Sequence, residues 1–286
     1  MSVCFLTTGP VEWASARYRA YWMAERMDDA VVIEAHKATD IPDVDNYVFQ
    51  KVINLDLVEQ LKEHGKRVWW DVCDPMHWFS PDTARRMVAQ VDGIVASNEG
   101  LADDLADWAH REVVTIPDRL KLSHYDCRKA HDRNVKPIRF IWFGSAQNRQ
   151  SLFSAYIVLE RLMVNGYNIE LTIMDDRPDL GLQYGPSCPV YRTKWRLDSE
   201  VQTLANHDIA ILPPYPGEWG RVKSNNKHLS AWACGLPVAD GLDFIETVLL
   251  MDWQRRKEQA DYGLNMVQDE YDITQSVQEW QQLLND

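Results

Sequence analysis

The chain has 286 residues, of which 45% are hydrophobic and 26% are charged, a balance typical of a soluble globular protein with room for two domains. Its formal net charge of −13 argues against a general affinity for nucleic acid or for an anionic membrane, because both are bound mainly through positive surface. Five scattered cysteines without a C-x-x-C pair indicate neither a disulfide framework nor a zinc cluster. They predict reduced thiols in a cytoplasmic protein.

The N-terminus lacks a basic region followed by a long apolar run, so we expect neither a signal peptide nor a membrane helix. In the first half of the chain, short apolar runs alternate with amphipathic stretches, as in parallel sheets with crossover helices. Strands are predicted at 2–7, 30–35, 47–51, 67–72, 92–97 and 112–116, and helices near 14–27, 55–64, 82–90 and 99–110.

Three residues near the N-terminus are candidates for binding a ligand on this side of the molecule. Gly9 follows the first predicted strand, and Arg17 and Arg19 lie near the start of the first predicted helix. The two arginines could meet an anionic ligand there. Residues two apart do not share a helix face, so we expect at least one of them to be structural or solvated.

The densest group of titratable residues comes at the end of the predicted strand 67–72. It contains Asp71, Asp74 and His77, any of which could take a proton from a hydroxyl group. A capped turn at Asp74-Pro75 and a core histidine would give the same pattern, so both interpretations stay open. The other histidines have no metal-ligand spacing with cysteines or carboxylates, and no metal site is predicted.

A polar segment at 121–136 without periodicity is the predicted linker between two domains. The second half begins with a strand at 138–144 that ends at Gly144, and a polar turn and a long helix to about 165 follow. Strand, glycine and helix start together form a geometry in which backbone N–H groups bind phosphate. Neither G-x-G-x-x-G nor a P-loop is present. Further strands are expected at 168–175, 188–192 and 208–212.

A second predicted anion site lies at 223–238. A helix start here offers free N–H groups and the positive end of its dipole, and Lys223 and Lys227 would place two ammonium groups on one side of it. Gly235 is the predicted C-cap. An ordinary capped helix with solvated lysines would show the same residues. The site consists of Ser224 or Asn225 as N-cap, followed by Asn226 and Lys227.

These elements predict two α/β domains with a ligand cleft between the carboxyl ends of their sheets. We expect an N-terminal domain at 1–125, a C-terminal domain at 126–270, and a closing helix at 271–286 that crosses back onto the first domain.

Several short motifs, in this order and spacing, resemble those of GT-B glycosyltransferases of the family-4 type, within the glycosyltransferase family 1/4 superfamily. The resemblance covers most of the chain. It implies two facing Rossmann-like domains with helices on both faces of each sheet, the donor being held by the C-terminal domain and the acceptor by the N-terminal domain. The motifs are Phe49-Gln50-Lys51, Val68-Trp69-Trp70-Asp71-Val72-Cys73-Asp74, Asp92-Gly93-Ile94-Val95-Ala96-Ser97-Asn98, Ile116-Pro117-Asp118, Trp142-Phe143-Gly144, Asp208-Ile209-Ala210-Ile211-Leu212-Pro213 and Ala233-Cys234-Gly235-Leu236-Pro237-Val238.

The resemblance also implies residue roles. Gly144 matches the glycine loop beside the donor phosphates, and Arg149 and Lys227 approximate the two cations that grip the diphosphate. Such cations would stabilise the leaving group without a metal ion. The base of a UDP- or GDP-sugar would lie against the loop that contains Thr193 and Trp195. Glu218 matches the loop that meets the donor sugar.

One position departs from the family. A second glutamate, which binds the donor ribose there, should stand where this chain has Ser230. Ribose recognition must differ, or the donor is unusual, or activity is lost.

We therefore expect a glycosyltransferase that needs no cofactor or metal and moves a sugar from a nucleotide-diphosphate sugar to a hydroxyl acceptor. A nucleotide-sugar epimerase and a non-catalytic nucleotide-sugar-binding protein are the alternatives. The acceptor is open among saccharide, lipid-linked glycan and small molecule. A hydroxymethylated base in phage-type DNA is less favoured by the acidic charge, and its sign would be a basic strip containing Arg17 and Arg19.

Overall fold

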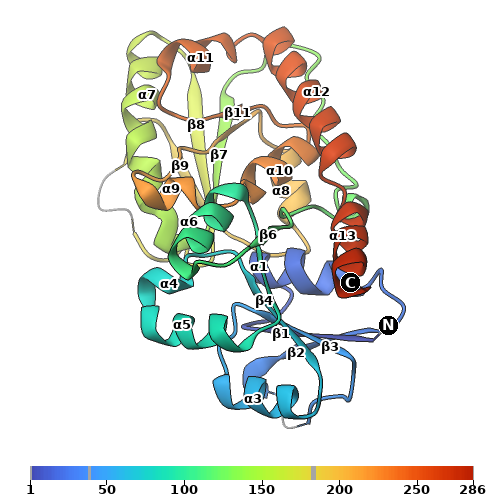
Figure 1. Cartoon of the computed structure of the whole chain (residues 1–286). Helices are drawn as coiled ribbons and strands as arrows, with labels where there is room; N and C mark the ends of the chain where they lie inside the picture. Colours follow the sequence, from blue (N-terminus) through green and yellow to red (C-terminus); the bar gives the residue numbers. More distant parts are fainter. Residues whose placement is uncertain (1, 38–39, 182–184, 286) are drawn as a thin grey trace. The chain divides into compact units, whose positions relative to one another are not determined.

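The computed structural model describes residues 2–37, 40–181 and 185–285 of the chain. The contacts divide it into two compact units, whose elements are labelled in Figure 1. Two short stretches from the C-terminal half group with the N-terminal residues. Unit 1 contains Met1–Lys121, Gly217–Ser224 and Asp272–Asp286, and unit 2 contains Leu122–Pro216 and Asn225–Tyr271.

Unit 1 is built on a six-stranded parallel sheet with the strand order β2-β1-β3-β4-β5-β6. Its central strands are short, mostly apolar and buried along their length, as expected for a parallel sheet covered on both faces. All six predicted strands are confirmed, with small differences at their ends. They are β1 Val3–Thr7, β2 Ala30–Glu34, β3 Asn46–Gln50, β4 Arg67–Val72, β5 Gly93–Ala96 and β6 Val114–Thr115.

The predicted helices of unit 1 are also present, but the first of them is not a regular α-helix. A π-helical turn at Arg17–Tyr21 separates α1 from α2. The four-residue helix α4 was not predicted, because so short a segment shows no helical period. The helices are α1 Ala14–Ala16, α2 Trp22–Ala24, α3 Leu55–Glu63, α4 Met76–Phe79, α5 Pro81–Gln90, α6 Glu99–Ala109, α9 Glu218–Arg221 and α13 Ile273–Asn285.

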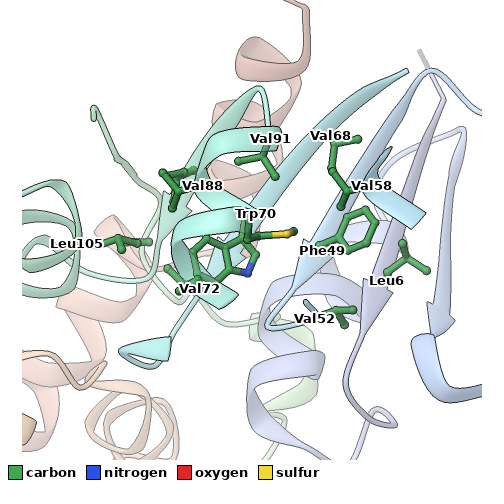
Figure 2. Close-up of a cluster of buried hydrophobic side chains, with 14 of the residues drawn as sticks. Leu6, Phe49, Val52, Val58, Val68, Trp70, Val72, Val88, Val91 and Leu105 are labelled. Carbon is green, nitrogen blue, oxygen red and sulfur yellow. The ribbon is translucent and has the colours of Figure 1, made fainter. Parts of the chain in front are cut away.

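The core on one face of this sheet gathers around Trp70 of β4 (Figure 2). Phe49 of β3 lies in the same buried cluster, together with Val58 of α3, Val88 of α5 and Leu105 of α6. These side chains fix three helices on the sheet. The loops at the carboxyl ends of β3, β4 and β5 are thereby held in place.

The predicted closing helix is α13, which packs within unit 1. Its buried Trp280 meets Phe5 and Trp69 edge to face, with ring centroids 6.1 and 6.4 Å apart. Arg67 Nη1 donates to the Leu284 carbonyl over 2.8 Å. The end of the chain therefore forms part of the core of unit 1.

Unit 2 has a five-stranded parallel sheet with the order β11-β10-β7-β8-β9. The predicted strands are again present, although β9 begins and ends two residues later than expected. The strands are β7 Ile138–Gly144, β8 Ile169–Asp175, β9 Val190–Lys194, β10 Ile209–Ile211 and β11 Val238–Ala239.

The helix expected after Gly144 is different from the prediction. A 3-10 helix, Ala146–Leu152, precedes the α-helix α7, Phe153–Val164. The helix of the second predicted anion site is confirmed as α10, Asn226–Ala233, and Gly235 just beyond it has the left-handed φ of 71° expected at a C-cap. Further helices that were not predicted are α8 Glu200–Ala205, α11 Phe244–Leu249 and α12 Trp253–Glu270.

Candidate functional site

At the carboxyl end of the unit 2 sheet, the structure brings Gly144 and Lys227 together. Gly144 ends β7 with a φ of 149°, which a residue with a side chain rarely adopts. A Cβ atom at this position would lie 3.5 Å from Lys227 Cδ. The Lys227 ammonium lies 5.4 Å from the ring centroid of Trp142 and 5.9 Å from that of Tyr215. A cation held by two aromatic faces therefore runs beside the glycine at the strand end.

The helix that carries Lys227 offers backbone donors at the same place. Asn225 is the N-cap residue of α10, but among the described residues its side chain makes no capping hydrogen bond. The first-turn N–H groups of Asn226, Lys227 and His228 point along the helix axis, at the positive end of its dipole. Ser224 stands before the N-cap residue and groups with unit 1.

The expectation that Lys223 and Lys227 flank one helix face is wrong, because α10 begins only at Asn226. Lys223 lies ahead of the helix and pairs with Asp74 in unit 1.

Arg149 is the second cation expected at the phosphates, and it is held by protein groups. Its Nε donates to Asp175 Oδ2 over 2.6 Å and its Nη2 to Asp175 Oδ1 over 2.7 Å. Nη1 donates to the Leu180 carbonyl over 3.0 Å, and Nη2 also reaches the Arg177 carbonyl. The hydrogen bond to Asp175, together with the charges of Asp175, Asp176 and Asp179, raises the pKa of Arg149. Each of its three nitrogens thus already has an oxygen partner.

A carboxylate also lies at the helix start after Gly144. The Ala146 N–H donates to Asp176 Oδ1 over 2.6 Å. The first turn of this 3-10 helix is therefore bonded to a negative group, which opposes an anion at this position.

Thr193 and Trp195 lie at the same edge of the sheet as Asp175. Thr193 is in β9 and is paired in register with Met174 of β8. The Trp195 N–H donates to the Asp175 carbonyl over 2.8 Å, just beyond the end of β9. The structure thus gathers the predicted base-binding residues near the end of β8.

Ser230, at the position of the family glutamate, is buried inside unit 2. Its Oγ lies 2.9 Å from the Tyr125 hydroxyl, and its residue surface is 1% exposed. A short side chain here packs against another residue of the same unit.

His228 follows Lys227 in the first turn of α10. Burial, with the Lys227 charge as a further cause, lowers the pKa of His228 to about 4. In the unfolded chain the pKa is close to the ordinary value of 6.5, so between pH 6.5 and 4 the unfolded state binds more protons. The contribution of His228 to the free energy of unfolding is therefore fully present at pH 7. It is lost as the pH falls from 6.5 toward 4.

We expect His228→Gln to reduce the loss of stability between pH 6.5 and 4 by roughly 2 kcal/mol. Urea unfolding at several pH values measures this. His36→Gln, which removes an exposed histidine, is the matched control and should leave the pH dependence unchanged. Parallel pH profiles for the wild type and His228→Gln would contradict the prediction.

In unit 1, Asp71 and Arg19 form a buried ion pair. Arg19 Nε lies 2.8 Å from Asp71 Oδ2, and Arg19 Nη2 lies 2.5 Å from Asp71 Oδ1. Arg19 Nη1 reaches Asp118 Oδ1 over 3.0 Å and the Ile116 carbonyl over 2.9 Å. Burial raises the pKa of Asp71, and the Arg19 charge opposes that rise. The pair ties the first helix to the ends of β4 and β6.

Arg17 is buried as well, so both arginines lie inside unit 1. Its Nη1 donates to the carbonyls of Val11 and Glu12, over 3.2 and 2.9 Å. These bonds hold the loop that follows β1. Gly9 lies in this loop, where its carbonyl accepts from Thr7 Oγ1 over 2.8 Å.

Asp74 lies between two ammonium groups. Lys51 contacts one of its carboxylate oxygens and Lys223 the other. Burial alone would raise the pKa of Asp74, but the two charges outweigh it and lower the pKa. Lys51 adopts a left-handed φ of 58°, an uncommon backbone for a lysine.

His77 is bonded to Asp104 rather than to Asp71 or Asp74. Its Nε2 lies 2.8 Å from Asp104 Oδ2, and burial lowers the pKa of His77 although Asp104 opposes this. The same carboxylate accepts from Trp78 Nε1 over 2.9 Å and from Arg221 Nη2 over 3.0 Å. Glu218, 76% exposed, accepts from Arg221 Nε over 3.0 Å.

Several residues that bind the candidate side chains were not identified from the sequence. Asp175 ends a strand, as Asp71 nearly does, and the same rule could have found it. Lys51 and Asp118 lie within motifs that were recognised, but without a spatial partner to give them a role. Asp104 lies in the middle of α6, where an aspartate resembles any solvated helix residue.

Within 2–37, 40–181 and 185–285, no group of three or more His, Cys, Asp or Glu side chains is arranged to hold a metal ion. Over the same residues, no helix is long and apolar enough to cross a membrane.

The fold is similar to that of known glycosyltransferases. An α-glucosyltransferase in complex with UDP and a 13-mer DNA containing a HMU base has a TM-score of 0.69 and 12% identity, with 100% of both chains covered. An α-glucosyltransferase with UDP-glucose and DNA containing an abasic site gives 0.68 and 11%, again over 100% of both chains. The chain has the GT-B fold.

TarM of S. aureus, in complex with fondaparinux, α-GlcNAc-glycerol and UDP, has a TM-score of 0.58 and 9% identity. The match covers 84% of this chain and 55% of TarM. No protein-family model matches the sequence, and no curated protein matches it either. At these identities the likeness concerns the fold.

Proposed function

We propose that this chain is a glycosyltransferase of the family-4 type that uses a nucleoside-diphosphate sugar as donor and a hydroxyl group as acceptor. The observation that carries the proposal is the position of the Lys227 side chain beside Gly144, at the carboxyl end of the unit 2 sheet. In open parallel sheets, ligands bind at this edge. The similar structures that contain UDP or UDP-glucose support a donor of this kind.

The proposed chemistry concerns charge on the leaving group. When the bond between the sugar C1 and the diphosphate oxygen breaks, the electron pair stays on the nucleoside diphosphate. The Lys227 ammonium and the first-turn N–H groups of α10 then stabilise the growing negative charge. Because Arg149 is bonded to Asp175, this proposal assigns the diphosphate to Lys227 and α10, and places Arg149 in support of the loop around it.

We propose that residues 126–270, apart from the segment 217–224 that groups with unit 1, bind the donor, and that residues 1–125 with that segment and the closing helix 271–286 form the acceptor side. The donor base would lie against Thr193 and Trp195, at the edge where Trp195 contacts Asp175. With Ser230 buried on Tyr125, the donor ribose would be recognised by other groups than the family glutamate.

Of the residues considered as bases, His77 is the one paired with a carboxylate rather than with cations. The ring is neutral at pH 7, and its partner Asp104 would stabilise the ring once it has taken up a proton. Asp71 is engaged by Arg19, and Asp74 by two lysines that lower its pKa and thus weaken it as a base. We therefore assign Asp71 and Asp74 to the structure of the acceptor side.

The function is tested by incubating the pure protein with UDP-glucose, UDP-galactose, UDP-N-acetylglucosamine and GDP-mannose and following donor consumption. We expect slow release of the free sugar from at least one donor, with water as acceptor. A donor converted into another nucleotide sugar would identify an epimerase instead. Thermal stabilisation by UDP or GDP without any turnover would identify a non-catalytic binding protein.

We expect this turnover to persist after treatment with excess EDTA. The positive charge that a metal ion would supply is already present in Lys227 and the start of α10. Initial rates with EDTA and with added Mg²⁺ or Mn²⁺ measure the effect. A tenfold or greater loss on chelation, restored by either ion, would contradict metal independence.

A hydroxymethylated base in DNA is a second candidate acceptor, because two of the similar structures hold DNA and match along the full length of both chains. Arg17 and Arg19, the cations expected to form a basic strip, are buried in hydrogen bonds. Transfer from the active donor to a 13-mer duplex with one hydroxymethylated base would favour this acceptor.

A further inference from the structure

Unit 1 carries three neighbouring aromatic side chains at its surface, the exposed Trp78 and Phe79 and the half-buried Trp219, here called the aromatic platform. The ring centroid of Trp219 lies 6.2 Å from that of Trp78 and 5.5 Å from that of Phe79. Trp78 is 39% exposed and Phe79 is 62% exposed. Contact between large apolar rings and water is unfavourable. A cluster of such rings at the surface therefore indicates a binding surface.

Hydrogen bonds and a cation–π contact hold the platform in position. Trp78 Nε1 donates to Asp104 Oδ2 over 2.9 Å, and Arg221 binds the other oxygen of this carboxylate over 3.0 Å. The Asn98 amide donates to the Val222 carbonyl over 3.0 Å. The Lys223 ammonium lies 4.6 Å from the ring centroid of Trp219. Rings fixed in this way present a preformed surface and lose little conformational entropy when a ligand binds.

The platform also lies on the side of unit 1 where a parallel sheet binds ligands. Trp78 and Phe79 belong to α4, which follows the carboxyl end of β4. Trp219 belongs to α9, in the segment Gly217–Ser224 that groups with unit 1. Trp78 and Phe79 also follow Asp74 and His77 directly in the sequence, after the carboxyl end of β4.

The local charge distinguishes between the flat ligands that could stack here. Residues 75–110 and 217–224 contain seven acidic and four basic residues, and the whole chain carries −13. A duplex or single strand of nucleic acid is bound mainly by neutralising its phosphates, which this surface does not favour. A neutral sugar ring has an apolar C–H face for the aromatic rings and hydroxyl groups that donate to carboxylates. Two carboxylates stand beside the platform: Asp104, which accepts from Trp78 and Arg221, and the exposed Glu218, which accepts from Arg221.

We propose that the aromatic platform binds a neutral saccharide acceptor by stacking against a sugar ring. This inference rests on the proposed function and names the class of acceptor. The sugar ring would pack on Phe79 and Trp219, and its hydroxyl groups would donate to the carboxylates of Glu218 and Asp104. Stacking of this kind is worth about one kcal/mol per ring.

The test uses the full-length protein and its Phe79→Ala and Trp219→Ala variants on an array of neutral oligosaccharides that includes gluco-, galacto- and N-acetylgluco-configured chains. We expect the wild type to bind at least one glycan and each variant to bind it about fivefold more weakly. Tyr262→Ala, which removes an equally exposed aromatic ring from unit 2, is the matched control and should bind like the wild type. Phe79→Ala removes an exposed ring and should fold normally.

The outcomes separate this inference from the proposed function. A wild-type protein that hydrolyses a nucleotide sugar but binds no glycan on the array overturns the saccharide platform and leaves the glycosyltransferase intact. Binding of a 13-mer DNA that both platform variants weaken would overturn it in favour of a nucleic acid. Platform-dependent glycan binding without any donor turnover would support the platform and contradict the proposed enzyme.

Discussion

Lys227→Ala is expected to lower kcat/KM for sugar transfer by roughly 100- to 1,000-fold, the usual effect of removing one group that stabilises charge in the transition state. Lys227 runs beside Gly144, and its ammonium lies close to the rings of Trp142 and Tyr215. Near apolar rings a positive charge interacts more strongly with a phosphate than it would in water. Initial rates with the active nucleotide sugar measure the loss.

The stabilisation of the folded protein by the matching nucleoside diphosphate should fall in parallel, since a ligand that binds the native state raises the melting temperature. Lys257→Ala is the control, because Lys257 is an exposed lysine paired with Asp261 on α12 and should matter for neither readout. Lys227→Arg keeps the charge and should retain part of the activity. If Lys227→Ala keeps full activity and full stabilisation by the diphosphate, the donor site lies elsewhere.

The parallel sheets could be predicted from the sequence because their strands carry a strong local signal. Runs such as Val3–Thr7 are mostly apolar and buried along their whole length, as burial on both faces demands, and they alternate with amphipathic helices. The grouping of segment 217–224 with unit 1 could not be predicted. It depends on contacts such as Lys223 with Asp74 and Arg221 with Asp104, which join residues more than a hundred positions apart.

The errors in the predicted helices have two physical causes. The helix α12 is long but carries polar residues around most of its surface, so its apolar side gives little periodic signal. The turn after Gly144 is a 3-10 helix bonded to Asp176, an interaction between neighbouring strand ends that local propensity does not contain. Both depend on tertiary packing rather than on the local sequence.

For the candidate site, the sequence predicted residue types and strand ends but could not predict partners. Gly144 and Lys227 meet as expected, because both belong to motifs at the carboxyl edge of one sheet. Asp71 and Arg19 were both candidates for chemistry, yet they pair with each other across 52 positions of sequence. In the sequence, an arginine and an aspartate that pair with each other cannot be distinguished from an arginine and an aspartate that bind a ligand.

Arg19→Met is expected to lower the free energy of unfolding by about 3 to 5 kcal/mol, the usual effect of removing one partner from a buried ion pair. Arg19 is buried and bonds two buried carboxylates, Asp71 and Asp118. Without the guanidinium, these carboxylates must stay charged in an apolar interior or take up protons. Either state destabilises the folded protein, whereas in the unfolded chain water hydrates the same carboxylates.

Because two compact units need not unfold together, hydrogen exchange of the β4 amides is a better measurement than one denaturation curve. Protection of Arg67–Val72 should fall in Arg19→Met and stay unchanged in Arg26→Met, which removes an exposed arginine near the end of the same helical segment. Asp71→Asn distinguishes the two roles proposed for this carboxylate. A catalytic Asp71 would lose transfer activity while β4 kept its protection, whereas the ion pair seen here predicts weaker protection of β4 and a donor site in unit 2 that still binds UDP.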